Sequence, residues 1–276
     1  MSIANEITRL QNDRRDIFDA LTAQGVTVPA NASFDDVANL ITSISGGYDG
    51  LEYVYGSSES SSISEVIWHG GEIGNSFFYG LFSVFDRNIP ISFPDHPTCV
   101  GSSAFLNARL KIDWDTLGAE LLAVGSNAFR INYTEDCSDQ VVRLPKFDGL
   151  THNDVNGQTS FGYTGPKAPS TYYFDTMQNI PREFFTNCGH TNLSVAFGSV
   201  GHPVTSCGLY PFHNSSSSAV ATITTFTTGE YLDTVKTALE NLKGSGNLTF
   251  IYKASEATTY NGTDYSAGDT IITSTP

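Results

Sequence analysis

The 276-residue sequence is poor in basic residues and in charge of any kind. It has 14 Lys and Arg against 29 Asp and Glu, a formal net charge of −15, and charged residues make up only 16% of it. The negative electrostatic potential of such a chain repels phosphate backbones and anionic membrane surfaces, so we expect no binding to nucleic acid. No apolar run reaches the length of a transmembrane helix, so we also expect no membrane insertion.

Sequence signatures of export, disulfide frameworks and common catalytic sites are also missing. The N-terminus lacks a basic region followed by an apolar core, so we expect synthesis in a cytoplasm without a secretory signal. The four cysteines are scattered and form no CxxC pair, which favours free thiols. Motifs of P-loop nucleotide binding, zinc proteases, nucleophile elbows and EF-hands do not occur. We therefore expect no enzyme and no cofactor.

Two kinds of chemical site remain as alternatives. Four Cys and His residues between 188 and 207 could bind zinc, although scattered core or loop residues are the simpler interpretation. Carboxylates also gather loosely, and two of them could flank a glycosidic bond or bind calcium rather than lie on a solvated surface. The residues are Cys188, His190, His202 and Cys207 for zinc, and Asp113, Asp115, Glu135, Asp136, Asp139, Asp148 and Asp154 for the carboxylates.

The first 45 residues have the spacing of two amphipathic helices. Ser2 and Gly25 bracket the first, whose apolar stripe is interrupted by Arg14, and Ser33 caps the second. Neither helix is long enough to be stable alone, so we expect a homo-oligomeric bundle, with a trimer favoured, or else a hairpin folded onto its own chain. The apolar positions are Ile3, Ile7, Leu10, Ile17 and Leu21, then Val37, Leu40, Ile41 and Ile44.

An imperfect repeat follows the Ser-rich segment 56–64. Copies of the form Ile/Val-Gly-x-Ser/Asn-Ala/Phe-Phe start at Ile73, Val100 and Val124, which are 27 and 24 residues apart, and a looser copy starts at Ile180. Short strand-like segments stand between the copies, so we predict a ladder of parallel strands with a tight Gly turn and a stacked Phe in each unit, rather than a non-repetitive β-rich domain. The predicted repeat core is Ile73, Phe77, Val100, Phe105, Val124, Phe129, Ile180 and Phe184.

The last 60 residues change character. Residues 219–226 alternate like a strand, 231–242 have helical spacing, and 248–252 are again strand-like. This order predicts an α/β unit that closes the solenoid. Asn261-Gly262 then predicts a hairpin turn.

Aromatic residues are abundant, and several stand in loop-like sequence beside Gly, Pro or Ser. Flat rings with polar neighbours stack on sugars or form protein interfaces, although the same rings could instead fill the core between irregular repeats. The candidate ligand surface is Tyr163, Tyr172, Tyr173 and Tyr210, with Phe174, Phe212 and Trp68 as further members.

Three elements of the N-terminal segment, MSIA-EITRLQ, GVTVP and ASFDDVANLI-SI, closely resemble a leader of many bacteriophage tail, tail-fibre and baseplate proteins. The resemblance implies an attachment or oligomerisation role for residues 3–44, other phage tail proteins as partners, and a place in the virion tail after synthesis in the bacterial cytoplasm. It does not specify which tail component the chain is.

The repeats resemble BspA-like leucine-rich repeats, whose units have the form I-G-x-x-A-F-x-x-C-x-x-L. Cys188 and Leu193 match the later positions in one copy, whereas the other copies lack the cysteine. The implied fold is a mixed α+β chain: a helical oligomerisation segment (1–47), a linker (48–64), an irregular leucine-rich-repeat-like solenoid (65–215) and a C-terminal α/β cap (216–276).

These expectations together describe a structural protein of a phage tail, in a fibre or associated with the baseplate. It would adhere to the host surface by contacting a glycan or a protein. A purely architectural tail subunit and a polysaccharide-cleaving tail enzyme are the alternatives.

Overall fold

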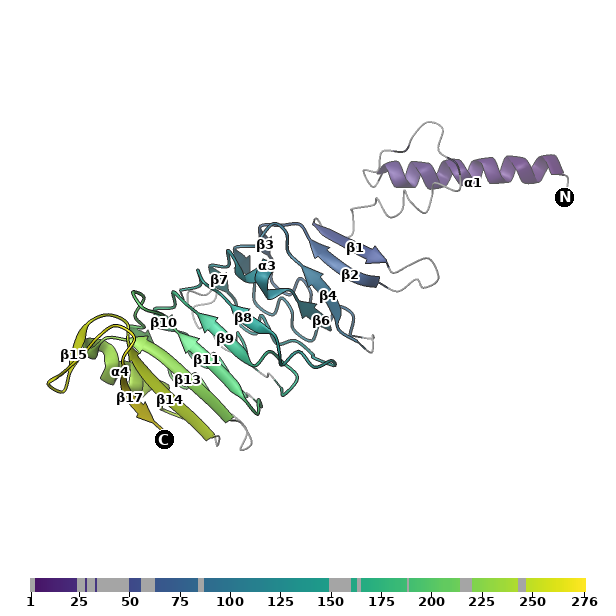
Figure 1. Ribbon diagram of the computed structural model, residues 1–276. Coiled ribbons are helices and arrows are strands. Elements are labelled where there is room, and N and C mark those ends of the chain that lie inside the picture. The colour runs from purple at the N-terminus through teal and green to yellow at the C-terminus, as the bar shows by residue number, and fades with distance from the viewer. Residues whose placement is uncertain are drawn as a thin grey trace. The chain divides into compact units, whose positions relative to one another are not determined.

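The computed structural model describes residues 3–23, 28, 33, 50–55, 63–83, 87–148, 160–162, 165–187, 189–213, 220–242 and 247–276. The chain divides into two compact units, Met1–Glu52 and Tyr53–Pro276. Helix α1 (Ile3–Ala23) belongs to the first unit, and the second contains nearly all the strands (Figure 1). The described residues are mostly β, with three helices, and they form a β-rich solenoid, as predicted for the repeat region. The second predicted helix lies outside the described residues.

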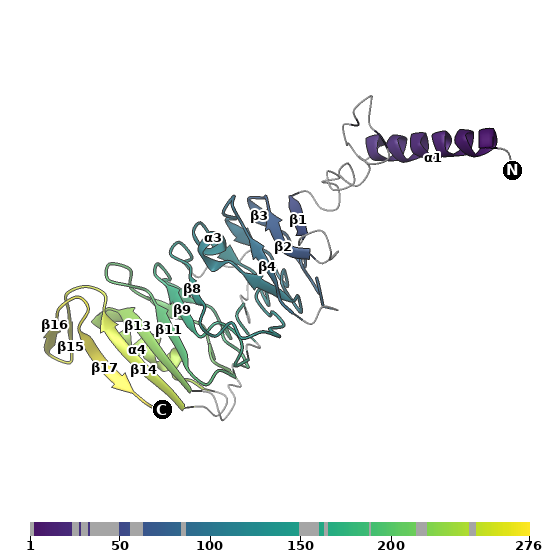
Figure 2. The same ribbon diagram turned by 45° about the vertical axis from the view of Figure 1, so that its right-hand side comes forward.

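The longer strands form one row of two sheets, in which neighbouring strands lie side by side in both views (Figures 1 and 2). Pairing is parallel from β2 to β6 and from β8 to β14, and only β17 is antiparallel to its neighbour in the second sheet. The first sheet has the order β1 (Leu51–Tyr55), β2 (Ile63–Trp68), β4 (Ile89–Ser92) and β6 (Leu110–Ile112). The second has the order β8 (Val141–Arg143), β9 (Thr171–Phe174), β11 (Leu193–Phe197), β13 (Val220–Thr227), β14 (Asn247–Ala254) and β17 (Thr270–Ser274).

Two-residue strands form the opposite row of the solenoid. They pair in parallel, each directly before a repeat turn. A long strand, a short strand and a compact turn therefore make one coil, and successive coils stack, as predicted for a repeat solenoid. The short strands are β3 (Glu72–Ile73), β5 (Cys99–Val100) and β7 (Ala123–Val124), then β10 (Asn179–Ile180) and β12 (Ser206–Cys207).

The repeat turns are bonded to one another through their backbones. Phe78 N donates to Ala104 O at 2.7 Å, and Phe105 N donates to Ala128 O at 2.9 Å in the next pair of coils. Further along, Phe185 N donates to Pro211 O at 2.7 Å. The turns therefore form a ladder of their own, which satisfies backbone groups that a bend in the chain would otherwise leave unpaired.

The repeat glycines Gly101, Gly125 and Gly208 serve close packing between coils and do not supply a left-handed turn. The left-handed residue lies two positions later, at Ser76, Ser103 and Asn127. A Cβ on Gly125 would lie 2.4 Å from Ser102 N of the preceding turn. The predicted role of Gly in opening a tight turn is therefore corrected: side chains are excluded there because the next backbone is too near.

Phenylalanines stack between the two rows in one continuous ladder. Neighbouring centroids lie 4.9 to 5.7 Å apart, and interplanar angles are 8° to 28°. Each ring is buried, and a stacked pair stabilises by about 0.5–1.5 kcal/mol beyond the area it buries. The six rings are those of Phe78, Phe105, Phe129, Phe161, Phe185 and Phe212.

Two predicted core phenylalanines are not rings of the ladder, although Phe184 is buried as predicted. The ladder uses Phe78 and Phe185, whereas Phe77 is half-buried against Trp68 and Phe184 is buried beside the ladder. The other predicted core residues, Ile73, Val100, Val124, Ile180, Phe105 and Phe129, are buried. Two further ladder rings, Phe161 and Phe212, belong to repeat copies that were not predicted.

The C-terminal part continues the solenoid. Strands β13 and β14 extend the second sheet, and α4 (Gly229–Leu239) between them buries Leu232, Val235 and Leu239. The hairpin of β15 (Thr258–Tyr260) and β16 (Thr263–Tyr265) turns at Asn261-Gly262, both with positive φ. The predicted strand–helix–strand order is present, and its strands lie in one sheet with β8 to β11. The predicted linker 48–64 contains strand β1.

Candidate functional site

The row of long strands is interrupted between β6 and β8, which do not pair. Strand β6 ends at Ile112 because Asp113 caps the short helix α3 (Trp114–Gly118). The Oδ1 atom of Asp113 accepts hydrogen bonds from Asp115 N at 3.1 Å and from Thr116 N at 3.4 Å. The helix packs against the end of β8, where a Cβ on Gly118 would lie 2.2 Å from Arg143 O.

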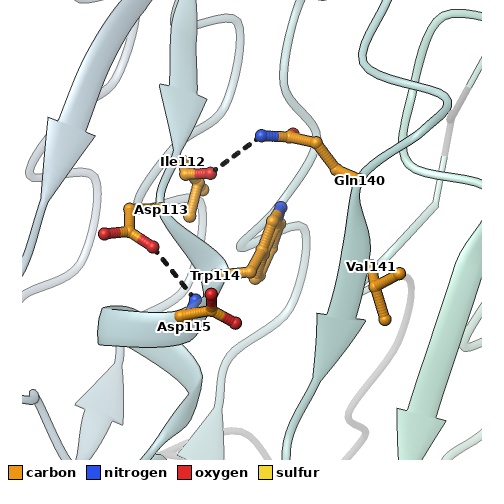
Figure 3. A pocket seen from close by; sticks show the side chains of 6 residues that line it. All are labelled: Ile112, Asp113, Trp114, Asp115, Gln140 and Val141. Carbon is orange, nitrogen blue, oxygen red and sulfur yellow. Dashed lines mark hydrogen bonds between the residues drawn. The ribbon is translucent and has the colours of Figure 1, made fainter.

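A groove lies at this interruption. One cavity of about 240 Å³ is bounded by the start of α3 on one side and by Gln140 and Val141 on the other (Figure 3). A second cavity of about 390 Å³ shares Ile112, Asp113 and Gln140 with it and extends over β4 to β2. We call the two together the sheet-break groove; its remaining lining residues are Trp114, Asp115, Glu65, Pro90, Ile91, Ser92 and Lys111.

Few hydrogen bonds cross the sheet-break groove. Gln140 Nε2 donates to Ile112 O at 3.4 Å, near the limit for such a bond. On the β2 side, Ser92 Oγ donates to Glu65 Oε1 at 3.1 Å. Trp114 is only 5% exposed and packs edge-on against the ladder ring of Phe129 at 5.0 Å. In Figure 3 the nitrogen end of its indole lies on the side of Gln140.

The candidate carboxylates do not converge on a catalytic or metal-binding arrangement within the part of the chain that the structure describes. Asp113 and Asp115 line the groove, but one oxygen of Asp113 is committed to capping α3. Asp136 is fully exposed, and its hydrogen bonds from Ser138 lower the pKa of its carboxyl. Over the described residues, no three His, Cys, Asp or Glu side chains are grouped so as to hold a metal ion.

The candidate zinc ligands are dispersed as far as they are described. His190 is buried, and burial lowers the pKa of its imidazole to about 4. Burial raises the pKa of the Cys207 thiol to about 12. His202 is exposed, and Cys188 lies outside the described residues.

Most of the candidate ligand aromatics are core residues. Tyr172, Phe174, Phe212 and Trp68 are buried, so their assignment to an exposed surface is wrong. Successive side chains of β9 point to opposite faces of the sheet, so Tyr172 faces the core and Tyr173 faces out. Tyr210 is half-buried in a repeat turn beside His213, and Tyr163 lies outside the described residues.

Tyr173 is the predicted ligand residue that the structure places on an outer sheet face, where it is 37% exposed. The Arg143 guanidinium lies 5.3 Å from the centre of its ring. Arg143 also donates two hydrogen bonds to the carboxylate of Asp175, at 2.8 and 3.3 Å, and these raise the pKa of the guanidinium. On this face the Tyr173 ring is therefore partly covered by Arg143, and the Arg143 guanidinium is already paired with the Asp175 carboxylate.

Helix α1 presents apolar side chains to solvent. Ile7, Leu10 and Ile17 are 51%, 44% and 36% exposed. Ile3 and Leu21 belong to the same helix, while Val37, Leu40, Ile41 and Ile44 of the second segment lie outside the described residues. None of the described helices is long and apolar enough to cross a bilayer.

Comparisons with models of protein families, with curated proteins and with solved structures found no match for this chain. Of the groove residues, Asp113 and Asp115 were candidates from the sequence, whereas Gln140 and Trp114 were missed as site residues. The available signal was Asp113 itself, a preferred N-cap residue directly after a strand, with a further acid in the first helical turn at Asp115.

Proposed function

We propose that this chain is a non-catalytic structural and recognition protein of a bacteriophage tail, in which α1 gathers identical copies and the solenoid contacts a host surface. The exposed apolar stripe of α1 is the observation that carries the proposal. A single amphipathic helix with such a stripe gains stability by burying it, and identical helices do so in a coiled coil. The resemblance of the N-terminal segment to phage tail leaders agrees with this role.

The charged side chains of α1 are consistent with a bundle whose other faces meet water. Arg9 and Asp13 form an exposed ion pair at 2.9 Å, one helical turn apart. Burying Ile7, Leu10 and Ile17, each roughly half exposed, contributes about 1 kcal/mol per side chain. Three helices together gain roughly 9 kcal/mol from these side chains, which favours association.

The stacked coils suit recognition because they are stiff. The Phe ladder and the turn-to-turn hydrogen bonds fix each coil on the next, so surface residues keep their positions without a ligand. We further propose that the solenoid is of the BspA-like leucine-rich-repeat type, because its repeat sequence resembles the units of that family. Several copies raise the effective concentration of binding surfaces, so weak contacts suffice for adhesion.

The mass of the full-length protein in solution tests the association. We expect three times the 29.8 kDa chain mass, and a monomer for the double variant Ile7→Asp, Leu10→Asp. The matched control is Gln11→Asp, Asn12→Asp, which adds the same charge to exposed polar positions of α1 and should remain trimeric. A wild-type protein that stays monomeric at high concentration refutes the proposal.

Phage particles carrying substitutions on the solenoid surface separate recognition from architecture. Intact particles that no longer adsorb to the host support recognition. Failure of particles to assemble supports a purely architectural subunit. Release of reducing sugar from host polysaccharide by the purified protein overturns the non-catalytic assignment.

A further inference from the structure

Two buried polar atoms at the floor of the sheet-break groove have no hydrogen-bond partner among the described residues. They are Nε1 of Trp114 and Oε1 of Gln140. Leaving such a group unpaired costs about 1–3 kcal/mol, and buried polar groups nearly always have a protein or water partner. Both residues line the same cavity, and Figure 3 shows the indole nitrogen on the side of the amide.

The chemistry of these two atoms restricts what can pair with them. The indole N–H only donates, and the amide oxygen only accepts. An ammonium or guanidinium group donates without accepting, and a carboxylate or phosphate accepts without donating. A hydroxyl group does both, as water does, so one hydroxyl satisfies the indole and the amide together.

The rest of the groove favours a neutral ligand with several hydroxyl groups. Glu65, Asp113 and Asp115 offer carboxylate acceptors, and Lys111 offers a donor. Three carboxylates against one ammonium repel anions, in agreement with the net charge of −15. Pro90 adds apolar surface for the C–H face of a sugar ring. We propose that the sheet-break groove binds a neutral saccharide, an inference that rests on the recognition role proposed above and names its ligand class.

Access to the floor of the groove depends on Gln140. Both unpaired atoms are shielded from solvent, and the Gln140 side chain lies on the nitrogen side of the indole (Figure 3). Its 3.4 Å bond to Ile112 O is long and therefore weak. Rotation of this side chain exposes the indole N–H and frees the Ile112 carbonyl as a further acceptor. A saccharide hydroxyl then accepts from the indole N–H and donates to the amide oxygen of the rotated Gln140 side chain.

The two tryptophans make this proposal directly measurable, because ¹⁵N-tryptophan labelling of the full-length protein gives two indole N–H signals, from Trp68 and Trp114. A Trp68→Phe variant assigns them. We would titrate a panel of neutral saccharides: glucose, galactose, N-acetylglucosamine, rhamnose and their common disaccharides. At least one should shift the Trp114 signal saturably and leave the Trp68 signal in place.

The Gln140→Leu variant should weaken that binding at least about fivefold, since it removes the amide and its hydrogen bonds. Gln178→Leu is the matched control, because it makes the same change at an exposed position of the short-strand side and should bind like the wild type. An unchanged melting temperature in both variants shows that folding is intact.

Three results would overturn the saccharide site. One is a Trp114 signal that no saccharide in the panel moves, another is a shift that survives Gln140→Leu, and the third is a stronger shift with a lysine-rich peptide. The mass measurement on α1 is independent of this titration. A trimer without saccharide binding therefore refutes the groove alone, and a saccharide-binding monomer refutes the association alone.

Discussion

Alanine in place of the repeat glycines tests how the coils are packed. Gly74 and Gly125 occupy the same position in two repeat turns, and neither has positive φ. They differ in their neighbours. A Cβ on Gly125 would lie 2.4 Å from Ser102 N and 2.7 Å from Gly101 C, whereas a Cβ on Gly74 meets no atom of the described structure within 4 Å.

The expected changes in the free energy of unfolding have opposite signs. At Gly125 the added methyl group forces two backbones apart, and overpacking of this kind costs about 1–3 kcal/mol. At Gly74 the backbone accepts alanine without strain, and the restricted unfolded chain gives a gain of about 0.4–1 kcal/mol. The two variants should therefore differ by roughly 1.4–4 kcal/mol, with Gly125→Ala the less stable.

Equilibrium unfolding in urea, followed by far-ultraviolet circular dichroism, measures this difference. The midpoint of Gly125→Ala should fall and that of Gly74→Ala should stay level or rise, with slopes like that of the wild type. Equal losses in both variants would show that glycine is needed for the turn conformation itself. Equal stability would show that the coils are not in close contact at Gly125.

Two further predictions concern the core. His190 is buried, and burial lowers the pKa of its imidazole to about 4, so on acidification the unfolded state takes up a proton before the folded state does. The free energy of unfolding should therefore fall by about 3 kcal/mol between pH 6.5 and pH 4, and this contribution should level off below pH 4. The His190→Leu variant should lack this part of the pH dependence when unfolding in urea is measured at each pH. In the ladder, Phe105→Leu and Phe129→Leu should show a coupling energy of about 0.5–1.5 kcal/mol in a double-mutant cycle, since the rings stack at 5.6 Å. In a second cycle with Phe105 and Phe212, which are not neighbours in the ladder, the changes in the free energy of unfolding should be additive. A coupling energy found in the second cycle and not in the first would contradict the stacked arrangement.

The repeat could be predicted from the sequence because its signal is local. Glycine stands four positions before five of the six ladder phenylalanines, and Pro181 takes this position before Phe185. The same rule locates the copies that were missed: Gly208 precedes Phe212 by four positions, and Gly157 precedes Phe161. Anchoring each copy on its last phenylalanine would also have selected the ladder rings instead of their neighbours at positions 77 and 184.

The exposed aromatic residues were harder to predict, because the neighbouring sequence does not tell on which face of the sheet an aromatic side chain lies. Tyr172 and Tyr173 are adjacent, yet one packs in the core and the other faces out. Only the register of β9 between β8 and β11 decides between them. Loop-like neighbours such as Gly, Pro and Ser were misleading, since in this fold they mark the repeat turns that bring phenylalanines inward.

At the sheet-break groove, two neighbouring coils lack the strand pairing that joins the other long strands. In a continuous sheet the Ile112 carbonyl would accept a backbone N–H from the next strand, but here it accepts only a long bond from a glutamine side chain. Asp113 ends the strand, α3 fills the space, and two polar atoms are left unpaired. Extending β6 to pair with β8 would remove these penalties, so their presence is unfavourable for stability alone. Departures of this kind in an otherwise regular fold are expected where function requires them, and a hydroxyl-bearing ligand supplies the partners that the missing strand pairing does not.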